Sequence, residues 1–200
     1  MQASDVSPNG SGLVLGVDYD DDRIRVLTIS NSGTLTDSGT TVGTGGDGPL
    51  NITFHHSGNY AFVANNLSSE IAIFDTSNPA LPALVNNVPT NLGPQTIVDS
   101  EDGTKVYVLT ANTVNIFNFS SSMPYLTLSG SFNHGLGPVL TYFGVDQMAL
   151  DVTQNRLFIS LNGVLAGFET DGSPLGNGNE SNGARSNHRS RLLNVWRSTF

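Results

Sequence analysis

Three aspartates alternate in the stretch "DYDDD", at Asp18, Asp20 and Asp22. In an extended loop alternate side chains point the same way, and three carboxylates on one side suit a hard cation such as Ca²⁺. The stretch departs from the calcium-loop pattern, because no glycine follows Asp22 and the twelfth position is Ile29 instead of a glutamate. Two interpretations stay open: a Ca²⁺ site, and a solvated turn flanked by two arginines.

His134 and Asp47 are candidates for acid–base chemistry. Both lie in glycine-rich loops that lead to a Gly-Pro pair, in "NHGLGP" and "GTGGDGP". A histidine titrates near neutral pH, so His134 is suited to act as a general base that activates water, with Asp47 orienting the ring or the water. An arginine or a backbone N–H would then have to stabilise the oxyanion, and the sequence assigns no such donor. The alternative is a hydrogen-bonded loop histidine without a catalytic role.

Asn91 and Asn133 lie in loops of the same kind, "TNLGP" and "NHGLGP". An amide side chain both donates and accepts hydrogen bonds, which suits contact with a polar ligand. We therefore predict that these two residues bind ligand.

Other patterns are better explained without chemistry. His55 and His56 are adjacent, so on an extended backbone they face opposite sides and cannot share a metal; we interpret both as structural. Residues 43–48 satisfy G-x-G-x-x-G, but Pro49 and a strand follow where a dinucleotide site needs a helix N-terminus. The chain has no cysteine, no G-x-S-x-G and no H-E-x-x-H, so thiolate, serine-hydrolase and zinc-protease chemistry have no support.

The candidate loops belong to a repeated unit. Segments that open with Gly-Pro begin at Gly48, Gly93 and Gly137, 45 and 44 residues apart. An earlier copy from Asp5 lacks its own Gly-Pro, so we expect the chain to begin inside a repeat. A fixed period in this range is typical of repeat architectures.

Within each unit, short apolar runs alternate with turns. "AFVA" and "IAIF" in one copy correspond to "VYVL" and "VNIF" in the next. Runs of this length bounded by Gly, Asn, Asp and Pro predict strands, and because they are apolar throughout, both faces of each sheet should be covered. We therefore predict an all-β fold of about four four-stranded antiparallel β-propeller blades, incomplete relative to a seven-bladed ring, with the candidate loops sharing one face beside the central channel.

Residues 33–75 resemble a blade of the lactonase-type β-propellers. In that family "GTLT" leads through a Gly-rich turn and Gly-Pro to "F-H-x-S-G" and "Y-x-V-A-N", and this segment holds each part. The "YAFVAN" strand is also similar to the YVTN-type repeat, and "IAIFDTSNPALP" to the LVIVD repeat. The resemblance covers residues 5 to about 176. It implies opening or closing of a lactone ring on a small sugar-acid or muconate-type substrate, with the face that holds the candidate loops as the site.

The number of units raises a question about closure. A seven-bladed ring at this period needs about 315 residues, whereas the repeat region ends near Gly176 after roughly four units. We interpret the chain as a truncated or split member of the family, with open blade edges that favour self-association. A closed four-bladed ring and two arcs that complete one another are the alternatives.

Two regions are expected, a β-propeller repeat region at 1–176 and a flexible basic tail at 177–200. The tail holds 4 of the 8 basic residues and the only tryptophan, and its first half is polar. With 8 Lys and Arg against 17 Asp and Glu, the net charge of −9 disfavours nucleic acid and anionic membranes as partners. A single lysine amid abundant Ser, Thr and Asn favours an extracellular protein.

Two functions remain open at this stage. The first is a lactonase-like protein with impaired activity, which requires no cofactor unless Ca²⁺ binds the three aspartates. The second is a non-catalytic propeller module that binds a protein, glycan or small ligand, because the sequence offers no oxyanion donor and no complete ring.

Overall fold

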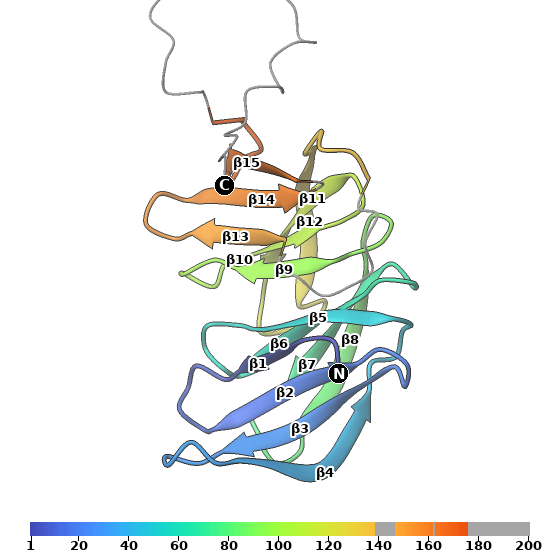
Figure 1. Ribbon diagram of the computed structural model, residues 1–200, viewed down its shortest axis with the longest axis vertical. Helices are drawn as coiled ribbons and strands as arrows, with labels where there is room; N and C mark the ends of the chain where they lie inside the picture. The colour runs from blue at the N-terminus through green and yellow to red at the C-terminus, as the bar shows by residue number, and fades with distance from the viewer. Residues whose placement is uncertain (139–146, 162, 176–200) are drawn as a thin grey trace, which may run out of the picture.

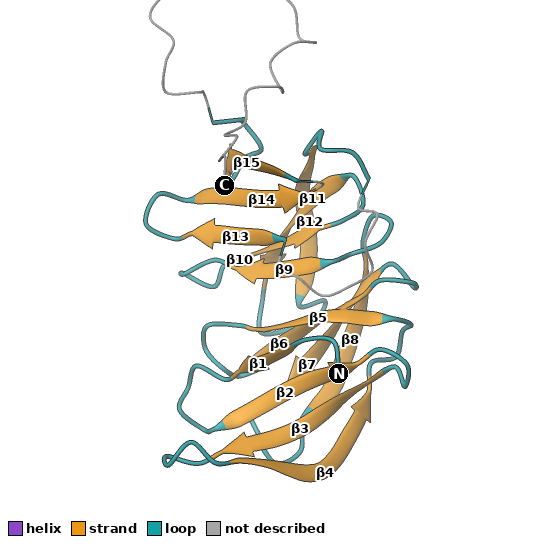
Figure 2. Ribbon diagram, viewed as in Figure 1, coloured by secondary structure: helices purple, strands orange, loops and turns teal. Residues whose placement is uncertain are grey.

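The computed structural model describes residues 1–138, 147–161 and 163–175. These residues form strands, turns and loops and include no helix (Figure 2). The strands assemble into four antiparallel sheets, each with its strands in chain order. The predicted all-β fold is confirmed. The predicted tail at 177–200 lies outside the described residues.

Each sheet is built from consecutive strands. The first holds β1 (Ser4–Val6), β2 (Leu13–Asp18), β3 (Arg23–Ile29) and β4 (Leu35–Gly43). The second holds β5 (Pro49–Phe54), β6 (Tyr60–Asn65), β7 (Glu70–Asp75) and β8 (Ala83–Pro89). The third holds β9 (Thr96–Asp99), β10 (Lys105–Leu109), β11 (Thr113–Phe119) and β12 (Leu126–Asn133). The fourth holds β13 (Met148–Asp151), β14 (Arg156–Leu161) and β15 (Val164–Glu169).

The repeat seen in the sequence corresponds to these sheets. Gly48 and Gly93 both adopt a φ of 65°; Gly48 stands directly before β5, and Gly93 stands three residues before β9 begins at Thr96. A side chain disfavours this left-handed conformation, so glycine at these positions fixes where each sheet begins. The first copy has a complete sheet despite lacking Gly-Pro, because β1 supplies its first strand. The run predicted directly after Pro138 falls on residues outside the described part.

The sheets stack face to face in chain order, from the blue end to the orange end of Figure 1. The central strand β6 shows how. Ala61 and Val63 point into an apolar cluster shared with the first sheet, whereas Phe62 and Ala64 point into one shared with the third. All four side chains are fully buried. A third cluster joins the third and fourth sheets through residues such as Leu109 and Ile159. The prediction that both faces of a sheet are covered is confirmed.

Polar side chains also tie the first strand of each sheet (β1, β5, β9, β13), which we call its innermost strand, to the first strand of the next sheet or to the segment before it. In each case an oxygen on one strand accepts a backbone N–H from the neighbouring sheet or the segment leading to it. The pairs are Asp5 Oδ2 with Phe54 N at 2.8 Å, Asn51 Oδ1 with Ile97 N at 3.0 Å, and Thr96 Oγ1 with Gln147 N at 3.3 Å. These bonds satisfy edge N–H groups that would otherwise be left without a partner.

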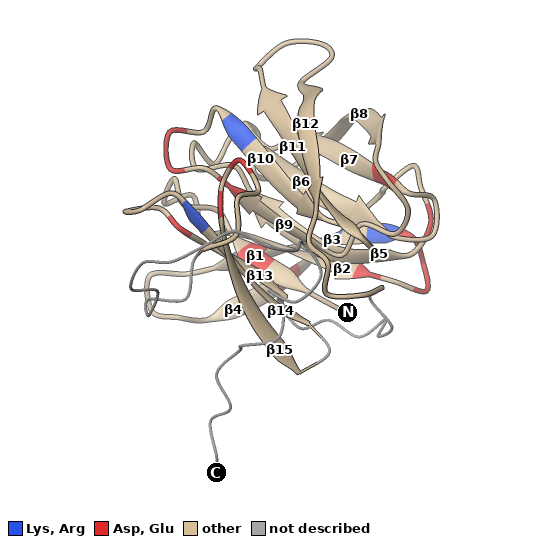
Figure 3. Cartoon of the chain, turned by 90° about the horizontal axis from the view of Figure 1, so that it is seen from above, with Lys and Arg blue, Asp and Glu red and all other residues tan. Residues whose placement is uncertain are grey.

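The described residues form an arc. No apolar cluster among them joins the first sheet to the fourth. Self-association through the open ends of this arc stays a prediction. Within the same part of the chain, no helix is long and apolar enough to cross a membrane. Acidic residues outnumber basic ones and many lie in loops (Figure 3).

Replacing Phe74, which is fully buried between the first two sheets, tests this stacking. We expect Phe74→Ala to lower the free energy of unfolding by about 3–5 kcal/mol, because it removes apolar contact and leaves a cavity. Leu81→Ala, at a side chain that is 63% exposed, should change it by less than about 0.5 kcal/mol. Urea unfolding of both variants measures the difference, and equal stabilities would contradict the assigned packing.

Candidate functional site

A groove of about 890 Å³ runs along the innermost strands of the four sheets. These strands, β1, β5, β9 and β13, follow one another across the front of the molecule in Figure 1 and contact one another in that order. The groove volume lies within the range of about 300–1,000 Å³ that is typical of small-molecule sites. The groove is therefore a candidate ligand site on the described part of the chain.

The groove lining combines apolar residues with amide, hydroxyl and carboxylate groups. It has no lysine or arginine from the described residues. Its main polar members are Ser4, Asp5, Asn51, Thr53, Thr96, Asp99 and Glu101. Such a wall is suited to hydrogen bonding and repels anions.

Asn51 and Thr96 are site residues that the sequence analysis missed. Each stands three positions after the glycine of its unit, Gly48 or Gly93, so a polar residue recurs at the same place in two copies. Asn51 accepts the backbone N–H of Ile97 in the third sheet, and Thr96 accepts that of Gln147 just before the fourth sheet. This recurrence of a polar residue at one position of the repeat is the sequence signal that could have identified them.

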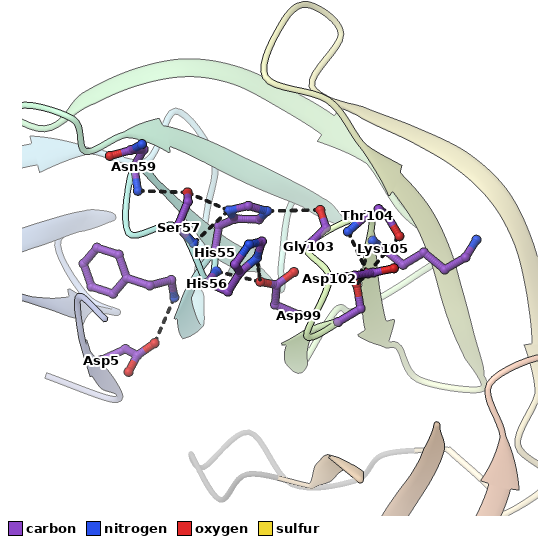
Figure 4. A network of polar contacts seen from close by, with 12 residues as sticks. Asp5, His55, His56, Ser57, Asn59, Asp99, Asp102, Gly103, Thr104 and Lys105 are labelled. Carbon is purple, nitrogen blue, oxygen red and sulfur yellow. Dashed lines mark hydrogen bonds and ion pairs between the residues drawn. The ribbon is translucent and has the colours of Figure 1, made fainter. Parts of the chain in front are cut away.

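His55, His56 and Asp99 form a compact cluster, and two of them, His56 and Asp99, line the groove (Figure 4). One ligand atom of each residue lies within 4.8 Å of those of the other two. The prediction that the two histidines face opposite sides is wrong, because they lie in the turn after β5, where the backbone is not extended. Their ring centroids are 4.3 Å apart. The structural role predicted for His55 agrees with its burial and its contacts to Ser57 and Gly103.

Asp99 supplies the carboxylate of this cluster, and only 8% of its side chain is exposed. Burial raises its pKa, and the backbone N–H of His56 and the charges of both histidine rings act in the opposite direction. Its Oδ2 accepts the His56 N–H at 2.7 Å and lies 3.5 Å from His56 Nδ1. Its Oδ1 is buried without a hydrogen-bond partner in the described structure.

The loops expected to share one face do so. The turn at 66–69 bonds to the loop at 44–48, since Asn66 N donates to Gly48 O at 2.9 Å. The "DYDDD" turn joins the same face, because Asp22 Oδ1 accepts the Gly48 N–H at 2.8 Å. Pro49 begins a strand, which confirms that the glycine-rich segment does not lead into a helix.

The structure does not gather Asp18, Asp20 and Asp22 into a set with ligand atoms within 4.8 Å of one another. Asp22 uses one carboxylate oxygen on the Gly48 N–H, as noted above. Arg23 pairs with Asp21 at 3.8 Å instead of with these three. The Ca²⁺ site stays a prediction.

His134 is almost fully buried, at 1% exposed, and does not lean over an open channel mouth. Its Nδ1 accepts the Leu136 N–H at 3.2 Å. Burial lowers the pKa of this ring, and the carbonyls of Thr110 and Ala111 oppose the shift. Asp47 is exposed in a loop before the second sheet, whereas His134 precedes the fourth. A catalytic role for the two stays a prediction.

Asn91 and Asn133 hold loops in shape. The side chain of Asn91 donates to Thr113 Oγ1 at 2.9 Å, and its backbone N–H donates to Asn115 Oδ1 at 3.0 Å. Asn133 Oδ1 accepts the Gly135 N–H at 2.7 Å. Neither residue lines the groove. Ligand binding by them stays a prediction.

The family pattern described as the lactonase 7-bladed β-propeller matches residues 3–134. The chain belongs to the lactonase family. The four stacked sheets are then blades of the propeller, and the innermost strands occupy the position that surrounds the propeller axis. The resemblance based on residues 33–75 is confirmed.

Three solved structures show how far the likeness to this lactonase-family chain extends. A functionally unknown protein from Desulfotomaculum acetoxidans is 42% identical with a TM-score of 0.83, over 88% of this chain and 56% of that one. A protein from Bacteroides uniformis described as a candidate 6-phosphogluconolactonase is 19% identical with a TM-score of 0.69, over 87% and 52%. The periplasmic gluconolactonase of Pseudomonas aeruginosa is 15% identical with a TM-score of 0.68, over 86% and 51%.

The latter two similarities show the fold alone. This lactonase-family chain spans little more than half the length of the solved structures it matches. No curated protein matches it.

The buried His134 should make stability depend on pH. Because its pKa is lowered in the folded state, the unfolded chain takes up a proton more readily, and stability should fall as pH drops below the ordinary value of 6.5. We expect urea midpoints measured at about pH 7.5 and about pH 5.5 to differ more for the unmodified chain than for His134→Gln. The same pH dependence in both proteins would contradict a neutral, buried ring.

Proposed function

We propose that the groove binds a small neutral sugar lactone, and that the chain supplies this binding wall in a lactonase-type propeller. The observation that carries the proposal is the lining of the groove. The exposed hydroxyl of Ser4 is of the kind that bonds to a sugar hydroxyl, and the Asn51 amide and Thr53 hydroxyl, which also bond to Ile97, add polar groups to the same wall. The volume of about 890 Å³ is large enough to admit a sugar ring.

The negative charge of the groove lining favours uncharged lactonase substrates over anionic ones. Asp5, Asp99 and Glu101 line it without a lysine or arginine from the described residues. A phosphorylated sugar or a muconate dianion would meet repulsion there, whereas an uncharged lactone would not. The gluconolactonase among the similar structures makes gluconolactone a reasonable first ligand, by analogy of family and fold.

A non-catalytic ligand-binding module is the second candidate. Attack of water on a lactone carbonyl produces an oxyanion, which requires positioned hydrogen-bond donors or a cation. The described groove lining contributes no arginine or lysine for this purpose. We therefore expect the chain without added metal to bind lactone without accelerating its hydrolysis.

Calorimetric titration with gluconolactam, a neutral ring analogue that does not hydrolyse, tests the binding proposal. We expect gluconolactam to bind at least about tenfold more tightly than 6-phosphogluconate. Ser4→Trp places a bulky ring in the groove and should abolish binding. Ser131→Trp, at an exposed position on β12 away from the groove, is the matched control. Failure of gluconolactam to bind, or tighter binding of the phosphorylated acid, would refute the proposal.

The rate of gluconolactone hydrolysis then separates the two candidates. Turnover above the rate in buffer that Ser4→Trp removes would favour an enzyme. Binding with no added turnover would favour the ligand-binding module.

A further inference from the structure

We propose that His55, His56 and Asp99 form a binding site for a divalent transition metal of the zinc type. Imidazole nitrogens and a carboxylate oxygen are ordinary ligands of Zn²⁺. The proposal concerns metal binding alone, so it does not depend on whether the groove takes a lactone.

Two sheets of the propeller bring the three ligands together. The histidines lie in the turn between β5 and β6 of the second sheet, and Asp99 ends β9 of the third. The His56 backbone N–H donates to Asp99 Oδ2 at 2.7 Å, which holds the turn against the strand end. Figure 4 shows both rings and the carboxylate gathered at this junction.

The spacing of the ligand atoms is close to what a metal requires. The three atoms lie within 4.8 Å of one another, and His56 Nδ1 is 3.5 Å from Asp99 Oδ2. With bonds of about 2.0–2.2 Å, a tetrahedral Zn²⁺ separates its ligand atoms by roughly 3.5 Å. Side-chain rotations that move the atoms by roughly 1 Å would complete the site.

Asp99 supplies an independent observation that points to a cation. Its side chain is 92% buried, because only 8% is exposed, and Oδ1 has no hydrogen-bond partner in the described residues. A buried carboxylate oxygen without a partner is costly, and a bound cation removes that cost. The opposite charge is not supplied by a lysine or arginine, since neither appears in a salt bridge with Asp99 among the described residues.

The surroundings assign a coordinating nitrogen to His55. Its Nδ1 now accepts the Ser57 backbone N–H at 3.2 Å, so the ring proton lies on Nε2 and is donated to Gly103 O at 3.1 Å. Metal binding at Nε2 would give up this contact and move the proton to Nδ1, where Ser57 Oγ at 2.8 Å can accept it, as the second nitrogen of a metal-binding imidazole requires. The two rings can approach residue 103 because it is a glycine: a Cβ there would overlap the ring of His56 and approach Nε2 of His55.

The site would remain open on one side. The His56 side chain is 47% exposed, and both His56 and Asp99 line the groove. Three protein ligands with an accessible fourth position are typical of exchangeable zinc sites. Water or a groove ligand would occupy that position.

Calorimetric titration of the full chain with Zn²⁺ alone, supported by Co²⁺ absorption, tests the proposal. We expect one ion per chain with a Kd on the order of micromolar, because three protein ligands bind less tightly than four. His56→Ala and Asp99→Asn should each weaken binding by at least about tenfold. Asp99→Asn retains an oxygen that can accept the His56 N–H, and His56→Ala alters a half-exposed side chain. A folding defect in one variant would therefore not imply a folding defect in the other.

Two control variants separate this site from adventitious binding. Asp102→Asn changes a nearby exposed carboxylate outside the cluster, and His188→Gln changes a histidine outside the described residues. Neither should alter Zn²⁺ affinity. The proposal is overturned if the chain binds no Zn²⁺ below about 1 mM, if both cluster variants bind as the unmodified chain does, or if His188→Gln removes the binding.

Discussion

Successive sheets of this chain bury their faces against one another, and this contact positions every other feature. In β6, neighbouring residues such as Phe62 and Val63 enter two different apolar clusters, so one strand stabilises two interfaces. A blade of this kind has no core of its own, since its side chains are buried only when a neighbour covers them. The innermost strands therefore keep their order along the groove because the outer parts of the sheets are packed.

The sequence was sufficient for the fold because the signals that define it are local and repeated. Apolar runs such as 61–64 are confirmed as strands. Gly48 and Gly93 precede the second and third sheets, where the backbone adopts a φ of 65° that favours glycine. The site was harder to predict. The pairing of His55 with His56 depends on a turn conformation, and their approach to Asp99 depends on how two blades meet. Neither is encoded by spacing along the chain.

Family membership and activity rest on different kinds of observation. The lactonase pattern over residues 3–134 settles the family, and the stacked sheets agree with it. The proposed lactone binding depends on groups in the groove, where carboxylates meet amides and hydroxyls without a lysine or arginine from the described residues. Two of the residues expected to be catalytic or ligand-binding, His134 and Asn133, have local hydrogen bonds that shape a loop, and the roles expected of them stay predictions. The acidic groove and the His55, His56 and Asp99 cluster are the features in which this chain's own chemistry is concentrated.

A double-mutant cycle between Phe62 of β6 and Phe119 of β11 tests the packing of adjacent sheets most directly. The two rings meet edge to face across the second and third sheets, with centroids 5.7 Å apart. We expect Phe62→Leu and Phe119→Leu to show a coupling energy of about 0.5–1.5 kcal/mol in urea unfolding. Losses that add to within about 0.3 kcal/mol would mean that the rings do not interact, and would contradict the stacking on which the groove depends.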